Sequence, residues 1–150
     1  MERRKFLSFT ASAFAFAMIP NSLKADDYRK LKPKVWTATK VDEAIKNLYG
    51  TSQLIEEGVT IKAAKVASSG AKVKIKFSTN IPSKTVALFQ DANPESAVAV
   101  FTVNKYDLMD YQLNIKMGQS GVITVVAEGL DGKLYVARHT MEVAAGGCEG

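Results

Sequence analysis

The sequence is poor in the residues that build most catalytic centres. Of its 150 residues, one is cysteine and one is histidine. One cysteine cannot form a disulfide within the chain, and a metal site needs three or four clustered ligands. The sequence contains no phosphate-cradling glycine loop and no nucleophile elbow. These absences argue against a metal site or a cofactor, and against a thiol enzyme or redox protein.

The single histidine offers no base for the single thiol. His139 and Cys148 are nine residues apart, and His139 falls on the last predicted strand. A Cys–His nucleophile pair would require the chain to fold back on itself with nothing to hold it there. We interpret His139 as a surface or structural residue, and we predict no catalytic residues.

Long apolar runs are absent beyond the N-terminus. Arg3 and Arg4 precede Phe6-Leu7, which is the twin-arginine pattern read by the Tat export machinery. The apolar stretch from residue 6 to residue 20 is too short for a membrane-spanning helix, which needs roughly 20 residues. We predict that residues 1–25 are a Tat signal peptide, cleaved after Ala25, and that the protein is periplasmic. An uncleaved N-terminal anchor is the alternative.

Removing this signal also removes most of the net positive charge of the chain. The whole chain carries a formal net charge of +5, whereas residues 26–150 contain 16 basic and 14 acidic residues. The basic excess is therefore not the footprint of a nucleic-acid partner, and nothing beyond the signal predicts a membrane partner. The remaining length suits one domain with one core.

The first part of the predicted mature chain contains one clear helix. Residues 26–38 are charged and interrupted by Pro33, and they predict an irregular N-terminal extension, with Trp36 packed on the domain or on a partner. Residues 39–50 place their apolar side chains on one helical face. Thr39 with Asp42 resembles a capping box, and Gly50 suits the helix end.

After Gly50 the apolar period changes from 3.6 to 2, which predicts about seven strands in residues 39–143. Seven short strands after one short helix predict a mainly β fold, an antiparallel β-sandwich. Ala97–Val103 is apolar on both sides, which predicts a strand covered on both faces, with a partner subunit as one candidate cover. The predicted strands are 60–66, 72–77, 85–89, 97–103, 111–117, 122–128 and 133–143.

The strand at 72–77 alternates strictly between lysine and apolar residues. Val73, Ile75 and Phe77 should face inward, with Lys72, Lys74 and Lys76 on the other face. We interpret the lysines as a solvated face or as protection of an edge strand. The alternative is that they recruit an anion or an acidic protein.

The tail holds the only thiol. Gly146 and Gly147 precede Cys148, and Glu149 and Gly150 follow it. Glycine lacks a Cβ and adopts positive φ readily, so residues 144–150 are predicted to be a flexible carrier arm of roughly 20 Å reach. Glu149 and the nearby terminal carboxylate disfavour the thiolate. Cys148 should therefore react slowly until a partner enzyme supplies a positive field.

This tail resembles that of the SoxY family, the sulfur-carrier subunits of bacterial thiosulfate oxidation, which end in Gly-Gly-Cys-Gly-Gly. The match covers four of the five positions and departs at Glu149. Ala127–Gly132 and Asn93-Pro94 add partial matches of low specificity. The resemblance implies an Ig-like sandwich, with Cys148 as the substrate attachment site. Glu149 leads us to expect partner enzymes with wider or more basic entrances.

The resemblance also implies the partners. In Sox systems a haem enzyme joins thiosulfate oxidatively to the carrier cysteine, and a hydrolase then releases sulfate. A sulfur dehydrogenase that oxidises the remaining sulfane is a further partner that the resemblance suggests. A second Ig-like subunit, SoxZ, forms a heterodimer with the carrier, and co-export with it is expected here. The carrier itself is not an enzyme.

One alternative from another class stays open. The chain could be an exported Ig-like structural or binding module whose tail cysteine forms an intermolecular disulfide. The two hypotheses differ in what Cys148 carries, which is measurable.

Overall fold

A computed structural model describes residues 26–144. The predicted signal peptide, with Arg3 and Arg4, lies outside the described residues, and so do Gly146, Gly147, Cys148, Glu149 and Gly150. No helix among residues 26–144 is long and apolar enough to span a membrane.

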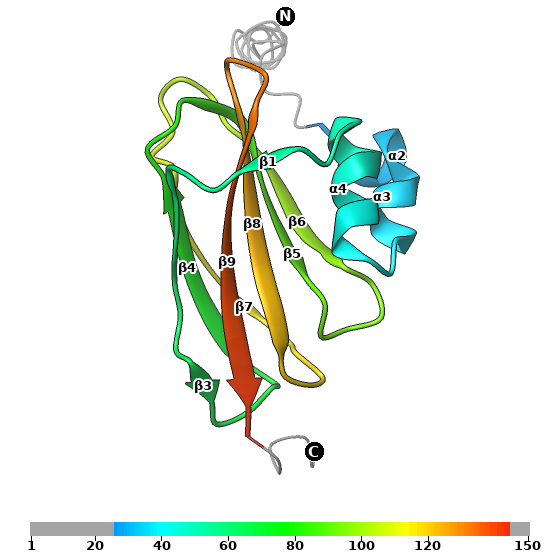
Figure 1. The fold of residues 1–150 in the computed structure, drawn as a ribbon, viewed down its shortest axis with the longest axis vertical. Helices are drawn as coiled ribbons and strands as arrows, with labels where there is room; N and C mark the ends of the chain where they lie inside the picture. Colours follow the sequence, from blue (N-terminus) through cyan, green and yellow to red (C-terminus); the bar gives the residue numbers. More distant parts are fainter. Residues whose placement is uncertain (1–25, 145–150) are drawn as a thin grey trace, which may run out of the picture.

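The described residues form three layers (Figure 1): short helices, a six-stranded sheet and a three-stranded sheet. The large sheet has the order β1-β9-β8-β5-β6, with β3 also paired to β9, and the small sheet has the order β2-β4-β7. Most pairs are antiparallel, but β1 and β3 run parallel to β9. The helices are α2 (Tyr28–Leu31), α3 (Pro33–Thr37) and α4 (Val41–Tyr49). The strands are β1 (Leu54–Ile55), β2 (Val59–Lys62), β3 (Val66–Ala67), β4 (Val73–Thr79), β5 (Ser83–Gln90), β6 (Ala97–Thr102), β7 (Asp110–Ile115), β8 (Gly121–Gly129) and β9 (Leu134–Val143).

The mainly β prediction is confirmed, although the described part holds nine strands and three helices rather than about seven and one. Each predicted strand is found, with ends shifted by a few residues. The segment 60–66 is divided between β2 and β3, and the two-residue β1 was not predicted. In the β8–β9 hairpin, Gly132 has φ +80°, a conformation that glycine adopts without strain.

The helix α4 follows its sequence pattern but not its predicted start. Ala44, Ile45 and Leu48 are buried against the large sheet, and Gly50, at φ +80°, donates its N–H to the carbonyl of Lys46. The predicted Thr39 cap is wrong, because Lys40 occupies the N-cap and makes no side-chain capping bond. Burial of one apolar face, rather than a cap, stabilises this start.

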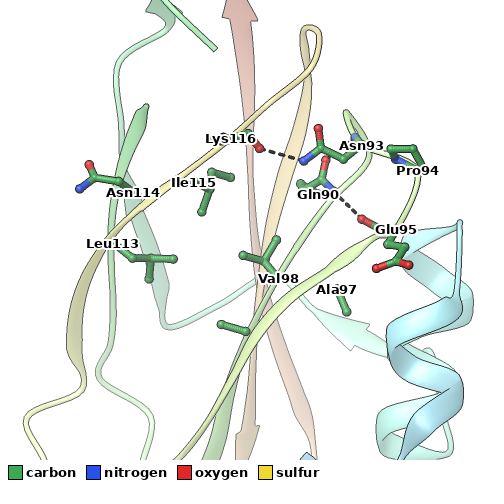
Figure 2. A pocket seen from close by; sticks show the side chains of 11 residues that line it. Gln90, Asn93, Pro94, Glu95, Ala97, Val98, Leu113, Asn114, Ile115 and Lys116 are labelled. Atoms are coloured by element: carbon green, nitrogen blue, oxygen red, sulfur yellow. Dashed lines mark hydrogen bonds between the residues drawn. The ribbon is translucent and has the colours of Figure 1, made fainter. Parts of the chain in front are cut away.

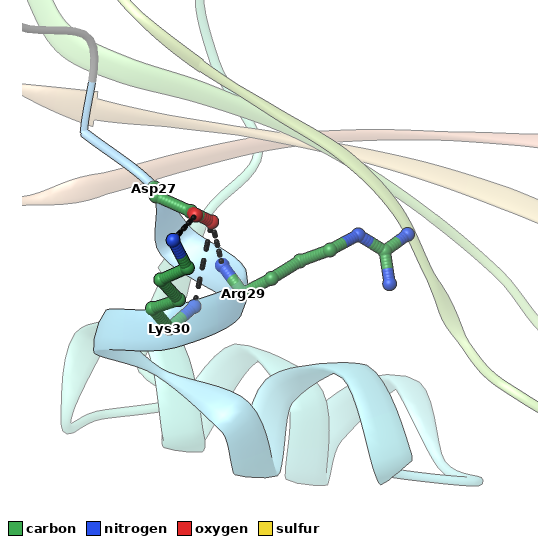
Figure 3. A network of polar contacts seen from close by, with 3 residues as sticks. All are labelled: Asp27, Arg29 and Lys30. Carbon is green, nitrogen blue, oxygen red and sulfur yellow. Dashed lines mark hydrogen bonds and ion pairs between the residues drawn. The ribbon is translucent and has the colours of Figure 1, made fainter.

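The prediction of an irregular extension at residues 26–38 is wrong. Asp27 caps α2 by accepting hydrogen bonds from the backbone N–H groups of Arg29 and Lys30, and it also pairs with the Lys30 ammonium at 3.5 Å (Figure 3). Pro33 begins α3 rather than breaking a helix, because the first helical N–H needs no partner.

Trp36 packs on its own domain. Its indole N–H donates to the carbonyl of Tyr28 at 3.1 Å, and the Arg29 guanidinium lies 4.4 Å from the ring centroid. These contacts join α2 to α3, so the helix layer is held within itself as well as against the sheet.

The large sheet is buried on both faces, which explains its apolar strands. Along β5, Val86 and Leu88 face the core between the sheets, whereas Ala87 and Phe89 face the helices. On β6, Val98 packs on the core between the two sheets, and Val100 packs on the core between the large sheet and the helices. Most residues of β6 are only half-buried, so this chain supplies part of the double cover predicted for β6.

The lysine row at 72–76 lies where the pattern placed it. Val73, Ile75 and Phe77 are buried in the core between the sheets, and the alternating lysines are exposed. However, β4 is the central strand of the small sheet, between β2 and β7. Protection of a free edge is therefore not the role of the β4 lysines.

Candidate functional site

The end of β9 is the last described point before Cys148, and it is fixed on both sides. β8 pairs with β9 antiparallel up to Gly121↔Met141, and β3 pairs with it in parallel up to Ala67↔Val143. The Ala144 N–H donates to the Ala67 carbonyl at 2.9 Å. Val143 and Ala144 are therefore held in a defined place, and we call these two residues the tail root. Cys148 follows four residues after Ala144.

A side chain adds to this anchorage. The Val143 N–H donates to the Ser120 hydroxyl at 2.8 Å, so the loop between β7 and β8 holds the last strand residue. At the same end, a Cβ at Gly70 would collide with the carbonyl of Met117, whose N–H donates to the Gly70 carbonyl at 2.9 Å. The loop before β4 and the loop after β7 are thus packed backbone to backbone, as only glycine allows.

The Asn93-Pro94 element joins two loops at this end (Figure 2). The Asn93 amide donates to the Lys116 carbonyl at 2.8 Å, and its Oδ1 accepts from the Gly118 N–H at 2.8 Å. Buried Gln90 holds the same turn: its Nε2 donates to the Glu95 carbonyl and its Oε1 accepts from the Asn93 N–H, both at 2.7 Å. The element therefore acts as a structural clamp.

An open groove of about 690 Å³ runs between β6 and β7. Val98, Leu113 and Ile115 face it in Figure 2, with the clamp at one end. Its lining is mostly aliphatic and amide, with Glu95 and Lys116 as its charged residues, and the lining set contains no cysteine, histidine, serine or threonine. Nothing in this groove provides a nucleophile with a base beside it.

His139 lies on β9 and faces the segment after β2. Its Nε2 is 2.9 Å from the Ala64 carbonyl oxygen, and the residue is half-buried. This placement agrees with the interpretation of a surface or structural residue. Within residues 26–144, no group of three or more His, Cys, Asp or Glu side chains is placed to hold a metal ion.

Tyr49 and Asp131 have pKa values shifted by burial or by hydrogen bonds that belong to the fold. Burial is the main reason that the pKa of Tyr49 is raised, and its hydroxyl lies 3.0 Å from the Thr85 hydroxyl, which donates to Glu128 at 3.2 Å. The pKa of Asp131 is lowered chiefly by a hydrogen bond from the Tyr135 hydroxyl. Asp131 stands in the β8–β9 turn, at the opposite end from the tail root (Figure 1).

Comparisons with known proteins place these features in context. The family profile described as "Sulfur oxidation protein SoxY" matches residues 45–148, from within α4 to the position of Cys148. The structure of the sulfur carrier protein SoxY from Chlorobium limicola f thiosulfatophilum is similar, with 31% sequence identity and a TM-score of 0.64. The similarity covers 73% of this chain and 96% of that one.

Other solved structures share the fold alone. Superoxide reductase (neelaredoxin) from Ignicoccus hospitalis is 17% identical with a TM-score of 0.52, over 59% of this chain and 81% of that chain. A putative superoxide reductase from Thermotoga maritima is 15% identical with a TM-score of 0.51, over 81% of this chain and 93% of that chain. A comparison with curated protein sequences finds no match.

The sequence pointed to the cysteine but not to its surroundings. Cys148 stood out because it is the only thiol and lies among glycines. The tail root was not foreseen, because Ser120 and Ala67 reach β9 from distant loops and neither carries a motif. Asn93 was noted as part of a partial match to the family, and its bridging role emerges only when the two loops are placed together.

Proposed function

This chain belongs to the SoxY family of sulfur oxidation proteins, and from that membership we propose that it holds sulfur oxidation intermediates covalently on Cys148. The observation that carries the proposal is the extent of the family match, which runs through the described fold and ends on the only cysteine of the chain. The earlier resemblance to the family is thereby confirmed. The prediction of a carrier rather than an enzyme agrees with the similar structure, which is that of a sulfur carrier protein.

The anchorage at the tail root supports this role. β9 is paired on both sides up to its end, so the fold offers a fixed base from which the tail begins. A carrier needs such a base, because the domain can then dock on an enzyme while the attached group reaches into the active site.

The proposed chemistry consists of two steps on Cys148. In the first, a bond forms between the Cys148 sulfur and the outer sulfur of thiosulfate; two electrons pass to a haem enzyme and the thiol proton is released. In the second, a hydrolase uses water to break the bond to the sulfone, which leaves as sulfate, and a persulfide remains on Cys148. A sulfur dehydrogenase that oxidises this sulfane is a further proposed partner.

Two parts of the proposal rest on the sequence and the family. The partner subunit is proposed to be SoxZ-like and to form a heterodimer with this chain. Arg3 and Arg4 support export by the Tat machinery to the periplasm, and because Tat carries folded proteins, the partner subunit could cross with this chain.

The test is the intact mass of the protein recovered from the periplasm of cells given thiosulfate and purified without reductant. We expect adducts of the thiosulfonate, persulfide or sulfonate kind on Cys148. Reductant should remove the disulfide-type adducts, and the Cys148→Ser variant should carry none.

Two outcomes would contradict the proposal. One is bare protein under every sulfur condition. The other is only a Cys148-linked dimer, which would support the alternative of a structural module joined by an intermolecular disulfide. Absence from the periplasmic fraction would contradict the proposed export.

A further inference from the structure

A second groove, separate from the one between β6 and β7, lies beside the tail root. It measures about 560 Å³. Its charged lining is Lys62 at the end of β2, Lys72 just before β4, and Lys74 and Lys76 on β4; the rest is small or apolar and includes Ala67, Ser68 and Met141. We call it the lysine groove. In Figure 1 the start of β4 and β3 lie next to the end of β9, at the end of the molecule where the tail leaves.

The lysine groove concentrates positive charge without balancing it. The residues that line it include four lysines and no carboxylate. Lys62 lies directly opposite Lys76 across the β2–β4 pair, and like charges in such positions repel and destabilise a sheet. Of the four groove lysines, Lys76 alone has an ion-pair partner among the described residues, Asp110 at 3.1 Å.

Protection of a free edge does not explain this arrangement. β4 is a central strand, so Lys74 and Lys76 do not shield a free edge. Their neighbours across the β4–β7 pair are Asn114 and Gln112, which offer no charge compensation. An anion in the groove would offset the repulsion between the lysines.

The tail root borders this groove. Ala67 lines the groove, and its carbonyl accepts the hydrogen bond from the Ala144 N–H. Cys148 is four residues beyond Ala144, which corresponds to a reach of about 13 Å when extended. A group on Cys148 is therefore tethered beside the groove.

We infer that the lysine groove is an anion-binding site that receives the anionic end of the sulfur group carried on Cys148. This inference rests on the proposed function, in which thiosulfonate and sulfonate adducts end in a negatively charged –SO₃ group. Each lysine ammonium offers three N–H donors, and ammonium groups bind tetrahedral oxyanions as point charges.

The test loads the purified protein chemically with tetrathionate. The Cys148 thiolate attacks a central sulfur of tetrathionate, a new S–S bond forms, the central S–S bond breaks, and thiosulfate leaves with the electron pair; the thiol proton passes to the buffer. We expect the backbone amide NMR signals of residues 66–76 to shift on loading at low ionic strength. In the double variant Lys62→Gln/Lys74→Gln these shifts should fall at least twofold, because the field of the groove is weakened.

Three controls make the result specific. Lys133→Gln, in the β8–β9 turn at the other end of the fold, should leave the shifts unchanged. A neutral adduct, formed with iodoacetamide, should not produce them. High salt should reduce them, because about 1 M salt screens charges beyond roughly 3 Å.

The inference is overturned if loading moves only the signals of residues next to Cys148. It is equally overturned if the double variant or the neutral adduct gives the same shifts in residues 66–76. Because tetrathionate needs no partner enzyme, the groove can be tested even if no adduct forms in cells. Conversely, adducts found in cells together with unshifted groove signals would reject the groove and leave the carrier function standing.

Discussion

At the scale of single residues, Asn93 does more than shape a turn. One side-chain amide bridges the loop after β5 to the loop after β7, through the Lys116 carbonyl and the Gly118 N–H. The second of these loops contains Ser120, which accepts the Val143 N–H at the tail root. The clamp therefore supports the base from which the tail begins, although it lies on a different strand connection.

We predict that Asn93→Ala lowers the free energy of unfolding by about 1–2 kcal/mol, because two hydrogen bonds are lost and their backbone partners lose their fixed positions. Urea denaturation followed by circular dichroism measures the change. The matched control is Asn114→Ala, on the exposed face of β7, which should change stability by less than about 0.5 kcal/mol. Equal effects in the two variants would show that the clamp does not contribute.

The residue scale is also where the sequence predicted the site best. Cys148 could be singled out because its signal is local: one thiol, flanked by glycines, in a chain without a second cysteine. The lysine groove could be anticipated only in part. The row on β4 is visible as an alternating pattern, but the approach of Lys62 depends on the register of β2 against β4, which no local pattern encodes.

At the scale of elements, Tyr49 links the helix layer to the large sheet. It lies at the end of α4, and its hydroxyl bonds to Thr85 on β5, which in turn donates to Glu128 on β8. Since the Thr85 hydroxyl donates to the carboxylate, it accepts from Tyr49, and the phenol must keep its proton. Burial raises the pKa of Tyr49 and favours the same protonated state.

We predict that Tyr49→Phe costs about 1 kcal/mol of stability at pH 7, through the lost hydrogen bond. The unfolded phenol has a pKa near 10 while that of the folded phenol is higher, so this contribution is complete below about pH 10 and is lost as the pH rises above it. By pH 11 the wild type should lose about 1.4 kcal/mol that the variant does not lose. Urea unfolding from pH 7 to pH 11 measures both effects.

The control for this prediction is Tyr106→Phe, whose ring is 81% exposed. It should follow the wild-type pH dependence, because it leaves the buried Tyr49 hydroxyl in place. If Tyr49→Phe and the wild type lost stability in parallel above pH 10, the buried phenol would not be the titrating group.

Helices and strands could be predicted where they were long enough to show a regular spacing of apolar residues. The strands and α4 each carry several apolar residues at regular spacing, and burial follows that spacing. By contrast, α2 and α3 span four and five residues, too few to show a helical period. They are stabilised by the Asp27 cap, the proline start and packing against the sheet, and isolated helices of this length are not stable.

At the scale of the whole molecule, the helices form part of the hydrophobic core together with the large sheet. Val35 on α3 is fully buried with Ile45 and Leu48 of α4 in a core that also contains Phe89 and Val136 of the large sheet. Without this layer, one face of the large sheet would expose its apolar residues. The sequence did not predict this layering, because the helix layer is divided among short segments.

We predict that Val35→Ala lowers the free energy of unfolding by about 2 kcal/mol, because it removes buried methyl groups and leaves a cavity. Leu31→Ala, at a position 62% exposed on α2, should change it by less than about 0.5 kcal/mol. Thermal and urea unfolding of both variants would decide this. A Val35 variant as stable as the Leu31 variant would mean that the helix layer is not part of the cooperative unit.

The position of β9 has a consequence for how the protein is made. β9 pairs with β8, but also with β1, whose residue Leu54 meets Leu134, 80 residues later in the chain. Ribosomes add about 5–20 residues per second. The start of β9 is therefore synthesised on the order of 4–16 s after β1. The large sheet therefore cannot be complete before residues 134–143 have been synthesised. A chain that reaches an export machinery reserved for folded proteins would then have completed β9, and with it the attachment point of Cys148.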